Sequence, residues 1–338
     1  MIKIAVDAMG GDNAPEATVL GAQLAVKEFD DIELTLYGDE TKIRKYLKNE
    51  ERIKIVHTDS YIDMGEHDPV RQIRTNRKSS LVLAMKSCKE GENDGLVTAG
   101  PTQAVIVGAH IIIKRIEQMS RVALCPIIPS ADGSHKLLLD VGANVELRPE
   151  HLEELAIYAT VAAKVIFGVE SPRVGLLNIG TEPGKGREVD QLTYERLMAN
   201  QKINFIGNVE TKEILTADCE ILLTDGFTGN MVMKTLEGTA KGTGIILANC
   251  IKSTLFGKIG YLFMRKNLKK YKQTLSADDV GGAMLCGVNV PLVKAHGSSN
   301  DFAFFCGIRR VRELIESNLI QTVVSLLPNK EEENNETE

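Results

Sequence analysis

The chain has 338 residues, of which 43% are hydrophobic and 25% charged. This composition supplies enough apolar side chains for one large α/β domain or two smaller ones, and it excludes global disorder. The formal net charge is −6, and residues 329–338, with one Lys and five Glu, carry −4 of it. The remaining body is too close to neutral to indicate a general affinity for nucleic acid.

In chain order, the patterns of apolar residues predict a strand at 2–6, a helix at 15–29, strands at 32–37 and 53–57, a largely helical segment at 70–89, a strand at 95–98, a helix at 102–115, strands at 122–127 and 137–141, a helix at 149–167, strands at 174–179, 204–206 and 221–224, a helix at 230–253, a strand at 292–295 and a mostly helical segment at 301–327. Strands interleaved with helices indicate βαβ units. We therefore expect an α/β fold of three layers, α/β/α, with a mainly parallel sheet. The acidic residues 329–338 are expected to be disordered.

The cysteines and the N-terminal residues indicate in which cellular compartment the protein is expected. The six cysteines are scattered and include no CxxC pair, which favours a reducing cytosol over a disulfide framework or a zinc site. The N-terminus enters a strand without a signal-peptide pattern, and no apolar run approaches the roughly 18 to 20 residues that span a bilayer. We expect a cytoplasmic protein, which is still free to touch a membrane surface.

Gly-rich turns follow five of the predicted strands and open the next helix. In a parallel sheet such turns lie along the carboxyl edge, where ligands bind, so we expect all five on one edge. Glycine lets backbone N–H groups approach an anion closely, and the helix N-terminus adds partial positive charge. One such turn is ordinary turn chemistry, but five together predict an anion site. The turns are DAMGGDNAP (7–15), TAGPT (98–102), NIGTEPGKG (178–186), DGFTGN (225–230) and HGSSN (296–300).

None of these turns is a dinucleotide-binding fingerprint. Residues 180–186 are similar to a P-loop, but their glycines are too close together, and Gly follows Lys where Ser or Thr is required. This argues against a nucleoside triphosphatase. The sequence also has no HExxH, no paired Cys/His set and no carboxylate cluster, so no metal is expected. A GxSxG motif, which would indicate a serine hydrolase, is absent as well.

A few side chains within the turns are candidates for chemistry. Lys185, between two glycines, is placed to reach a phosphate or a developing oxyanion, or else is a solvated loop lysine. Asn230 either caps a helix or polarises a carbonyl. His296 suits an acid/base role or a structural hydrogen bond. Asp7 and Asp12 would orient Lys185 or the turn. Direct contact with a bound anion is not expected, because their carboxylates would repel it. The candidates for binding phosphate or substrate are Asp7, Gly10, Gly11, Asp12, Gly180, Thr181, Gly184, Gly186, Thr228, Gly229, Ser298 and Ser299.

Residues 238–277 form a basic segment, with eight Lys or Arg, no acidic residue and several large apolar residues. A basic amphipathic stretch suits anionic lipid headgroups or an acidic helical partner. The alternative is a helical hairpin that packs its apolar face and solvates its lysines. Nucleic acid is disfavoured, because the patch is short and the body acidic. The candidate contact residues are Leu255, Phe256, Lys258, Leu262, Phe263, Arg265, Lys266, Lys269 and Lys270.

Six segments stand out in order from residue 7 to residue 299: DAMGGDNAP (7–15), LDVGANV (139–145), GLLNIGTEPGKG (175–186), NFIGNVE (204–210), DGFTGN (225–230) and KAHGSS (294–299). Together they resemble the successive signature segments of the PlsX family. The chain departs from the family pattern at two turns. It has VTAGPTQA (97–104) where the family usually has VSAGNTGA, and VGGAM (280–284) where the family usually has YGGAP. These departures leave open which local contacts the two turns make.

The resemblance implies a phosphate:acyl-acyl-carrier-protein acyltransferase that serves bacterial phospholipid synthesis. It further implies a fold similar to the isocitrate/isopropylmalate dehydrogenase group, a homodimer and no redox cofactor. Lys185 and Asn230 would lie at the reacting centre. Acyl carrier protein and inorganic phosphate would be the partners, with peripheral contact to an anionic membrane at the inner face of the cell membrane.

Three hypotheses of function follow. The first is transfer of a long-chain fatty acyl group from acyl-acyl-carrier protein to inorganic phosphate, giving acyl phosphate. The second is a short-chain phosphotransacetylase that uses acyl-CoA, and the third is a catalytically silent membrane scaffold. For the architecture, we expect residues 1–328 to form a single domain, in part by analogy with the family, with a helical hairpin projecting at about residues 245–275.

Overall fold

The computed structural model describes residues 1–274 and 281–328, with side chains described up to residue 268 before the gap. The elements, in chain order, are β1 (Ile2–Asp7), α1 (Glu16–Glu28), β2 (Ile32–Gly38), α2 (Glu40–Arg44), β3 (Ile53–His57), α3 (Pro69–Thr75), α4 (Ser80–Lys89), β4 (Gly95–Thr98), α5 (Thr102–Gly108), the π-helix η1 (Ala109–Ile113), β5 (Ala123–Pro129), β6 (His135–Leu139), α6 (Pro149–Phe167), β7 (Arg173–Asn178), α7 (Glu188–Ala199), β8 (Asn204–Glu210), the 3₁₀-helix η2 (Thr211–Glu213), β9 (Ile221–Leu223), α8 (Gly226–Lys252), α9 (Leu255–Thr274), β10 (Ala283–Cys286), β11 (Leu292–Lys294), α10 (Asp301–Glu316) and α11 (Leu319–Leu326).

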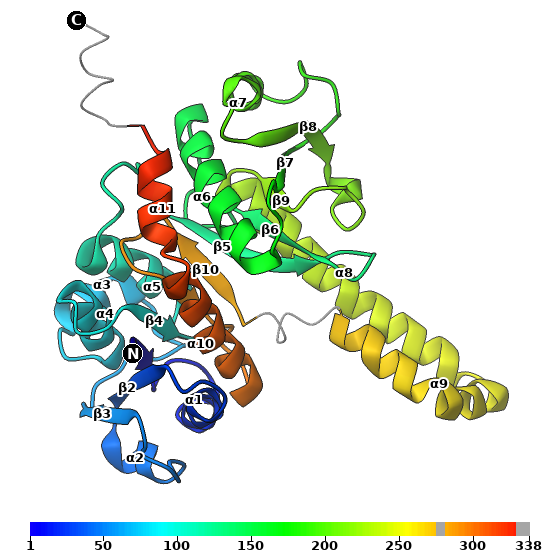
Figure 1. The fold of residues 1–338 in the computed structure, drawn as a ribbon. Coiled ribbons are helices and arrows are strands. Elements are labelled where there is room, and N and C mark those ends of the chain that lie inside the picture. Colours follow the sequence, from blue (N-terminus) through cyan, green and yellow to red (C-terminus); the bar gives the residue numbers. More distant parts are fainter. Residues whose placement is uncertain (275–280, 329–338) are drawn as a thin grey trace, which may run out of the picture.

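The strands form one mixed, mostly parallel sheet in the order β3-β2-β1-β4-β11-β10-β5-β6-β9-β7-β8 (Figure 1). Strands β1 to β4 and β11 pair in parallel, and so do β6, β9, β7 and β8. Between these two blocks, β10 is antiparallel to both of its neighbours and β5 is antiparallel to β6. The expected α/β fold with a mainly parallel sheet is confirmed.

The expectation that all five Gly-rich turns share one edge of the sheet is wrong. Strand β5 runs in the direction of β11, and β6 is antiparallel to β5, so the two parallel blocks run in opposite directions. The turns after β1, β4 and β11 therefore lie at one edge, and the turns after β7 and β9 lie at the opposite one. The periodicity of single strands carries no information about this reversal. The reversal is set by how the two blocks of strands pair with each other.

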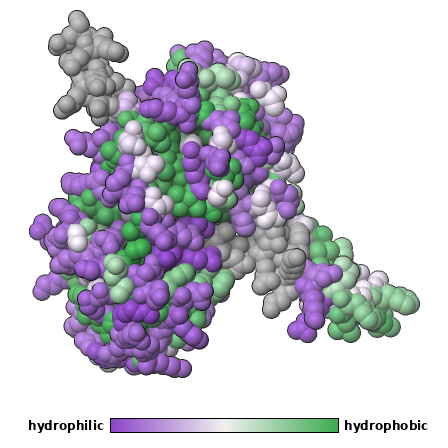
Figure 2. Space-filling model, viewed as in Figure 1, coloured by the Kyte–Doolittle hydropathy of each residue, from purple (hydrophilic) through white to green (hydrophobic). Residues whose placement is uncertain are grey.

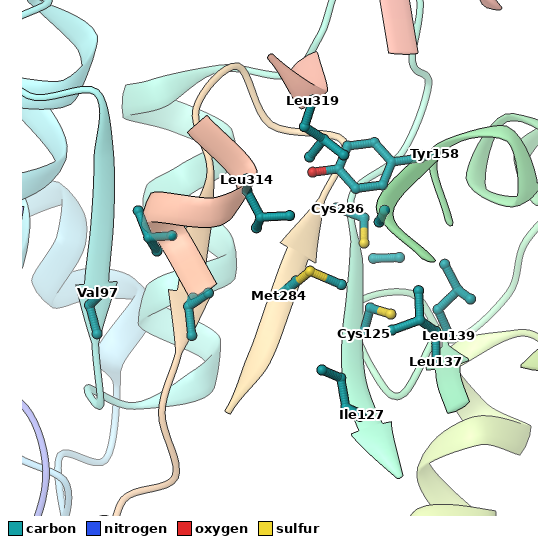
Figure 3. Packing of buried hydrophobic residues seen from close by; sticks show 14 of the residues in the cluster. Val97, Cys125, Ile127, Leu137, Leu139, Tyr158, Met284, Cys286, Leu314 and Leu319 are labelled. Atoms are coloured by element: carbon teal, nitrogen blue, oxygen red, sulfur yellow. The ribbon is translucent and has the colours of Figure 1, made fainter. Parts of the chain in front are cut away.

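Helices cover both faces of the sheet, which confirms the three layers. Alternate residues of a strand point to opposite faces. Accordingly, Ile4 and Val6 belong to a core cluster with α1, α6, α10 and α11, whereas Ala5 belongs to a second cluster with α4 and α5. A third cluster packs Leu138 and Leu222 against the first turns of α8. The first cluster continues across the junction of the two blocks, where side chains of β5, β6, β10 and α6 meet (Figure 3).

Most predicted elements are present with small shifts in their ends. Helix 149–167 has the expected bounds, because Pro149 occupies its first turn and Gly168 ends it in the left-handed conformation, with φ of 67°. The segment 70–89 is two helices, α3 and α4, since Asp68 caps the first and the second begins only at Ser80. Helices α2 and α7 and strand β10 were not predicted.

The predicted helical hairpin is present and protrudes from the body (Figure 1). It is longer than expected, because α8 runs for 27 residues from Gly226 before α9 returns alongside it. Within the described residues, no helix is both long and apolar enough to cross a membrane. The expected disorder of 329–338 falls outside the described residues.

Candidate functional site

A cleft of about 420 Å³ lies between the first turns of α8 and strands β5, β10 and β11. Asn230, Met233, Lys234 and Glu237 line it from α8; their spacing places them on one face of that helix. Leu124, Pro126 and Ile127 of β5 give the cleft an apolar wall, and the turn after β11 contributes His296 and Ser299.

Three of the predicted turns converge beside this cleft. The turn after β1 is bound to the turn after β11, because the N–H of Asp12 donates to the carbonyl of Gly297 at 2.7 Å and the amide of Asn13 donates to that of Ser298 at 3.0 Å. Gly11 has a φ of 105°, which permits this approach without steric strain. The convergence follows from sheet order, since β1, β4 and β11 are adjacent.

Asp7 holds two of these turns together from a buried position. Its carboxylate accepts from the Ser80 hydroxyl at 2.6 Å and from the Thr98 hydroxyl at 2.8 Å. Burial raises the pKa of the Asp7 carboxyl, and the hydroxyl donors oppose that rise. A Cβ on Gly10 would lie 2.6 Å from one oxygen of this carboxylate. Asp7 and Gly10 therefore organise the turn and do not line the cleft.

The start of α8 packs against the turn after β6, at residues 140–145. Asp225 is the helix cap and accepts from the N–H of Thr228 at 2.7 Å. The interpretation of Asn230 as the cap is therefore wrong. Its side-chain amide instead donates to the carbonyl of Val141 at 3.0 Å and lines the cleft. The Asn230 amide has a second N–H that this bond does not use.

Lys185 lies in a separate loop, after β7. Its ammonium is 4.0 Å from Glu182, and the side chain is 48% exposed. The loop is held by Asn178, whose amide donates to the carbonyl of Lys185, and by Asn208, whose amide donates to that of Glu182. Gly180, Thr181, Gly184 and Gly186 belong to this loop and, like Lys185, are not among the residues that line the cleft.

One ion pair connects this loop to α8. Arg187, at the end of the loop, donates to the carboxylates of both Asp190 and Asp225. These partners raise the pKa of the Arg187 guanidinium. The structure thus links the Lys185 loop to the helix that carries Asn230, but it does not bring the two side chains into one cavity. A role for Lys185 at the reacting centre remains a prediction.

His296 and Ser299, two of the candidates from the last turn, line the cleft, and Ser298 does not. The Nδ1 atom of His296 is 2.9 Å from the hydroxyl of Ser298, and its ring is exposed. Ser299 is buried. This arrangement suits proton transfer at His296 and hydrogen bonding to a substrate oxygen at Ser299.

Sequence reasoning missed one functional candidate, Lys294, which ends β11 and lines the cleft. Burial lowers the pKa of its ammonium, the charge of Lys234 lowers it further, and Asp12 opposes this. The signal was present, because Lys294 opens the segment KAHGSS that was recognised for other reasons. Both departures from the family pattern also border the cleft, through Gln103 and through Gly282 and Ala283.

Other sites are poorer candidates. A cavity of about 560 Å³ lies where β6, β7 and β9 begin, away from the Gly-rich turns, and none of the predicted site residues lines it. Within the described part of the chain, no group of three or more His, Cys, Asp or Glu is arranged to hold a metal. Five of the cysteines are buried, and burial raises the pKa of Cys88 to about 12 and that of Cys219 to about 11.

The outer part of the hairpin exposes large apolar side chains (Figure 2). Leu255, Phe256, Leu262 and Phe263 are between 69% and 86% exposed, so in the single chain they do not pack inside the hairpin as the alternative required. Lys258, Arg265 and Lys266 are exposed as well. The side chains of Lys269 and Lys270 lie outside the described ones.

A family model described as "Fatty acid synthesis protein" matches residues 2–322. This chain belongs to that family. A protein of Acholeplasma laidlawii named phosphate acyltransferase is 48% identical over 334 residues, which cover 98% of this chain and all of the relative. A protein of the same name from Bacillus cereus (strain G9842) is 42% identical over 326 residues, covering 96% of this chain and 98% of the relative. These relatives support an acyltransferase activity, and the family assignment made from the six segments is confirmed.

Solved structures agree on the fold. A phosphotransacetylase from Streptococcus pyogenes aligns with a TM-score of 0.61 at 17% identity, over 93% of this chain and 94% of the other. A branched-chain phosphotransacylase from Enterococcus faecalis aligns with a TM-score of 0.58 at 15% identity, over 93% of this chain and 99% of the other. At these identities the likeness concerns the fold alone.

Proposed function

We propose that this chain transfers an acyl group from a thioester to inorganic phosphate, releasing a free thiol and forming an acyl phosphate. The observation that carries the proposal is the match to proteins named phosphate acyltransferase over nearly the whole length of both chains. The cleft supports it, because polar groups from β11, α8 and the last turn face an apolar wall. Such a site accommodates an anion next to an acyl chain.

The reaction needs little covalent assistance from the protein, because a thioester is already activated. An oxygen of hydrogen phosphate attacks the carbonyl carbon, and the carbon–sulfur bond of the resulting tetrahedral intermediate breaks. The proton of hydrogen phosphate balances the one that the departing thiolate takes up. The protein has to hold phosphate in line with the carbonyl and stabilise the oxyanion. We assign the oxyanion contact to the free N–H of Asn230 and to Lys185, and the proton transfer to His296.

The donor is proposed to be a long-chain fatty acyl group on acyl carrier protein, with the product used for phospholipid synthesis. The basic and apolar hairpin supports this, since an acidic carrier protein and an anionic membrane surface are both complementary to it. We further propose that the chain works as a cytoplasmic homodimer in peripheral contact with the membrane. Residues 1–328 are proposed to act as one domain.

The donor test compares two thioesters at a fixed phosphate concentration. Phosphate-dependent thiol release is expected to be much faster with long-chain acyl-carrier protein than with acetyl-CoA. Faster release from acetyl-CoA would instead identify a short-chain phosphotransacetylase. Absence of release from both donors would leave the scaffold hypothesis.

A further inference from the structure

Lys294 presents a positive charge to the cleft without a matching acceptor. It is the last residue of β11, its side chain is half-buried, and it lines the cleft. Among the described residues, no oxygen accepts a hydrogen bond from its ammonium and no carboxylate pairs with it. Taking a charge out of water is unfavourable unless it is paired, so a site that keeps this lysine is suited to an anion.

A second lysine near Lys294 makes a bound anion more favourable at this place. Lys234 faces the same cleft from α8, and its positive charge, like burial, lowers the pKa of the Lys294 ammonium. Lys234 has a carboxylate of its own nearby, Glu237, at 3.8 Å. The negative charge of Asp12 favours protonated Lys294, but among the described residues the two side chains form no ion pair.

Ser299 adds a neutral donor at the same place. It is only 3% exposed and lines the cleft. Its backbone N–H donates to the carbonyl of His296 and its carbonyl accepts from Asn13, but its hydroxyl has no partner among the described residues. Because Ser299 lines the cleft, this hydroxyl is available to a ligand there.

The class of ligand follows from these groups. Helix α10 begins two residues after Ser299, and Ala303 in its first turn lines the same cleft, so the positive end of a 16-residue helix lies beside Ser299, with the acidic Asp301 in that turn. A cation, a hydroxyl and a helix N-terminus together suit a small tetrahedral oxyanion. The Lys185 loop also precedes a helix, α7, but its lysine is half exposed and has Glu182 as a neighbour.

We propose that Lys294 binds the inorganic phosphate substrate, with Ser299 donating a hydrogen bond to it, in the cleft between α8 and strands β10 and β11. This rests on the proposed function and goes beyond it, because it locates the phosphate at the turn after β11 and not in the Lys185 loop. Phosphate there would lie next to the apolar wall of β5, along which an acyl chain would reach the same cleft.

The test uses Lys294→Met and Lys294→Arg, with Lys27→Met as the control, an exposed lysine on α1 away from the cleft. Loss of a charged hydrogen bond is worth about 1.5–3 kcal/mol, so the KM for phosphate is expected to rise on the order of 10- to 100-fold in Lys294→Met. The KM for the acyl donor should not change, the Arg variant should recover part of the phosphate affinity, and the control should equal the wild type.

A second measurement needs no turnover. Inorganic phosphate, without acyl donor, should raise the Tm of the wild type and of Lys27→Met but not of Lys294→Met. If wild type lacks phosphate-dependent turnover but shows this shift, and Lys294→Met loses it, the proposed function fails while the phosphate site stands. Unchanged phosphate KM and Tm response in Lys294→Met would overturn the inference, as would a wild type that phosphate does not stabilise. Should Lys294→Met fail to fold, Ser299→Ala takes its place, and an unchanged phosphate KM there overturns it equally.

Discussion

Two glycines of the segment DGFTGN, Gly226 and Gly229, are required by close packing. A Cβ on Gly226 would clash with the carbonyl of Asn144, and one on Gly229 would clash with the carbonyl of Asp140. Asp140 in turn accepts hydrogen bonds from four backbone N–H groups, those of residues 124, 142, 143 and 144. The two recognisable segments LDVGANV and DGFTGN therefore depend on each other sterically, and together they position Asn230.

Gly229→Ala tests this account at a single residue. The added methyl group forces α8 away from the turn at 140–145, and overpacking of this kind costs about 1–3 kcal/mol of unfolding free energy. Gly238→Ala is the matched control, because Gly238 is on the same helix and a Cβ there would meet nothing within 4 Å. It should stabilise the protein by about 0.5–1 kcal/mol. Urea denaturation measures both, and equal stability of the two variants would contradict the packing argument.

Asn230→Ala and Lys185→Ala test the assigned oxyanion contacts. Removing one such donor commonly costs about 2.7–4 kcal/mol of activation free energy, or 10²–10³ in kcat. Asn230→Ala is expected to show this loss directly, since Asn230 lines the cleft. Lys185→Ala shows it only if the loop after β7 brings Lys185 to the reacting carbonyl when substrate binds. Near-normal kcat in both variants, with the fold intact by circular dichroism, would show that the assignment is wrong.

At the scale of elements, local sequence signals predicted most strands and helices but not how they pair. The caps of α6 and the apolar run of β1 are set by neighbouring residues, so the sequence alone identified them. Strand β10, with four residues between glycines, has no alternation to reveal it, and its antiparallel pairing with β5 and β11 depends on distant segments. Lys294 was missed although it opens the segment KAHGSS, because the sequence does not show that tertiary packing turns it toward the cleft.

The hairpin of α8 and α9 gives a prediction about membranes. Phe256 and Phe263 are 86% and 84% exposed, so the change of both to Ser is expected to weaken binding to anionic vesicles with little dependence on salt. Met198→Ser, at an exposed apolar residue on α7, is the control and should have no effect. Vesicle co-sedimentation measures the binding, and unchanged binding of the double variant would contradict the apolar contact.

The basic residues of the hairpin are expected to act differently. Changing Arg265, Lys266, Lys269 and Lys270 to Glu should weaken vesicle or carrier binding steeply, and most at low salt, because each basic residue contributes on the order of 1 kcal/mol near an anionic surface. The Phe variant should leave carrier binding in solution intact. If neither set of changes altered either interaction, the hairpin would have a structural role only.

At the scale of the whole molecule, the reversal between the two parallel blocks determines where the site lies. Because the blocks run in opposite directions, the Gly-rich turns separate into two groups, and the cleft forms along β5 and β10, where the blocks meet. The chain brings Asn230, His296 and Lys294 to it from segments far apart in the sequence. The sequence motifs identified the family and most of these segments, but not which of them share a cavity.

The most direct test of the account measures the products of a single reaction. Wild-type protein is incubated with long-chain acyl-carrier protein and inorganic phosphate, and free thiol and acyl phosphate are quantified together. We expect the two products in equal amounts, both absent when phosphate is omitted. Thiol release that is independent of phosphate, or that gives free fatty acid and no acyl phosphate, would contradict the assignment of this chain as a phosphate acyltransferase.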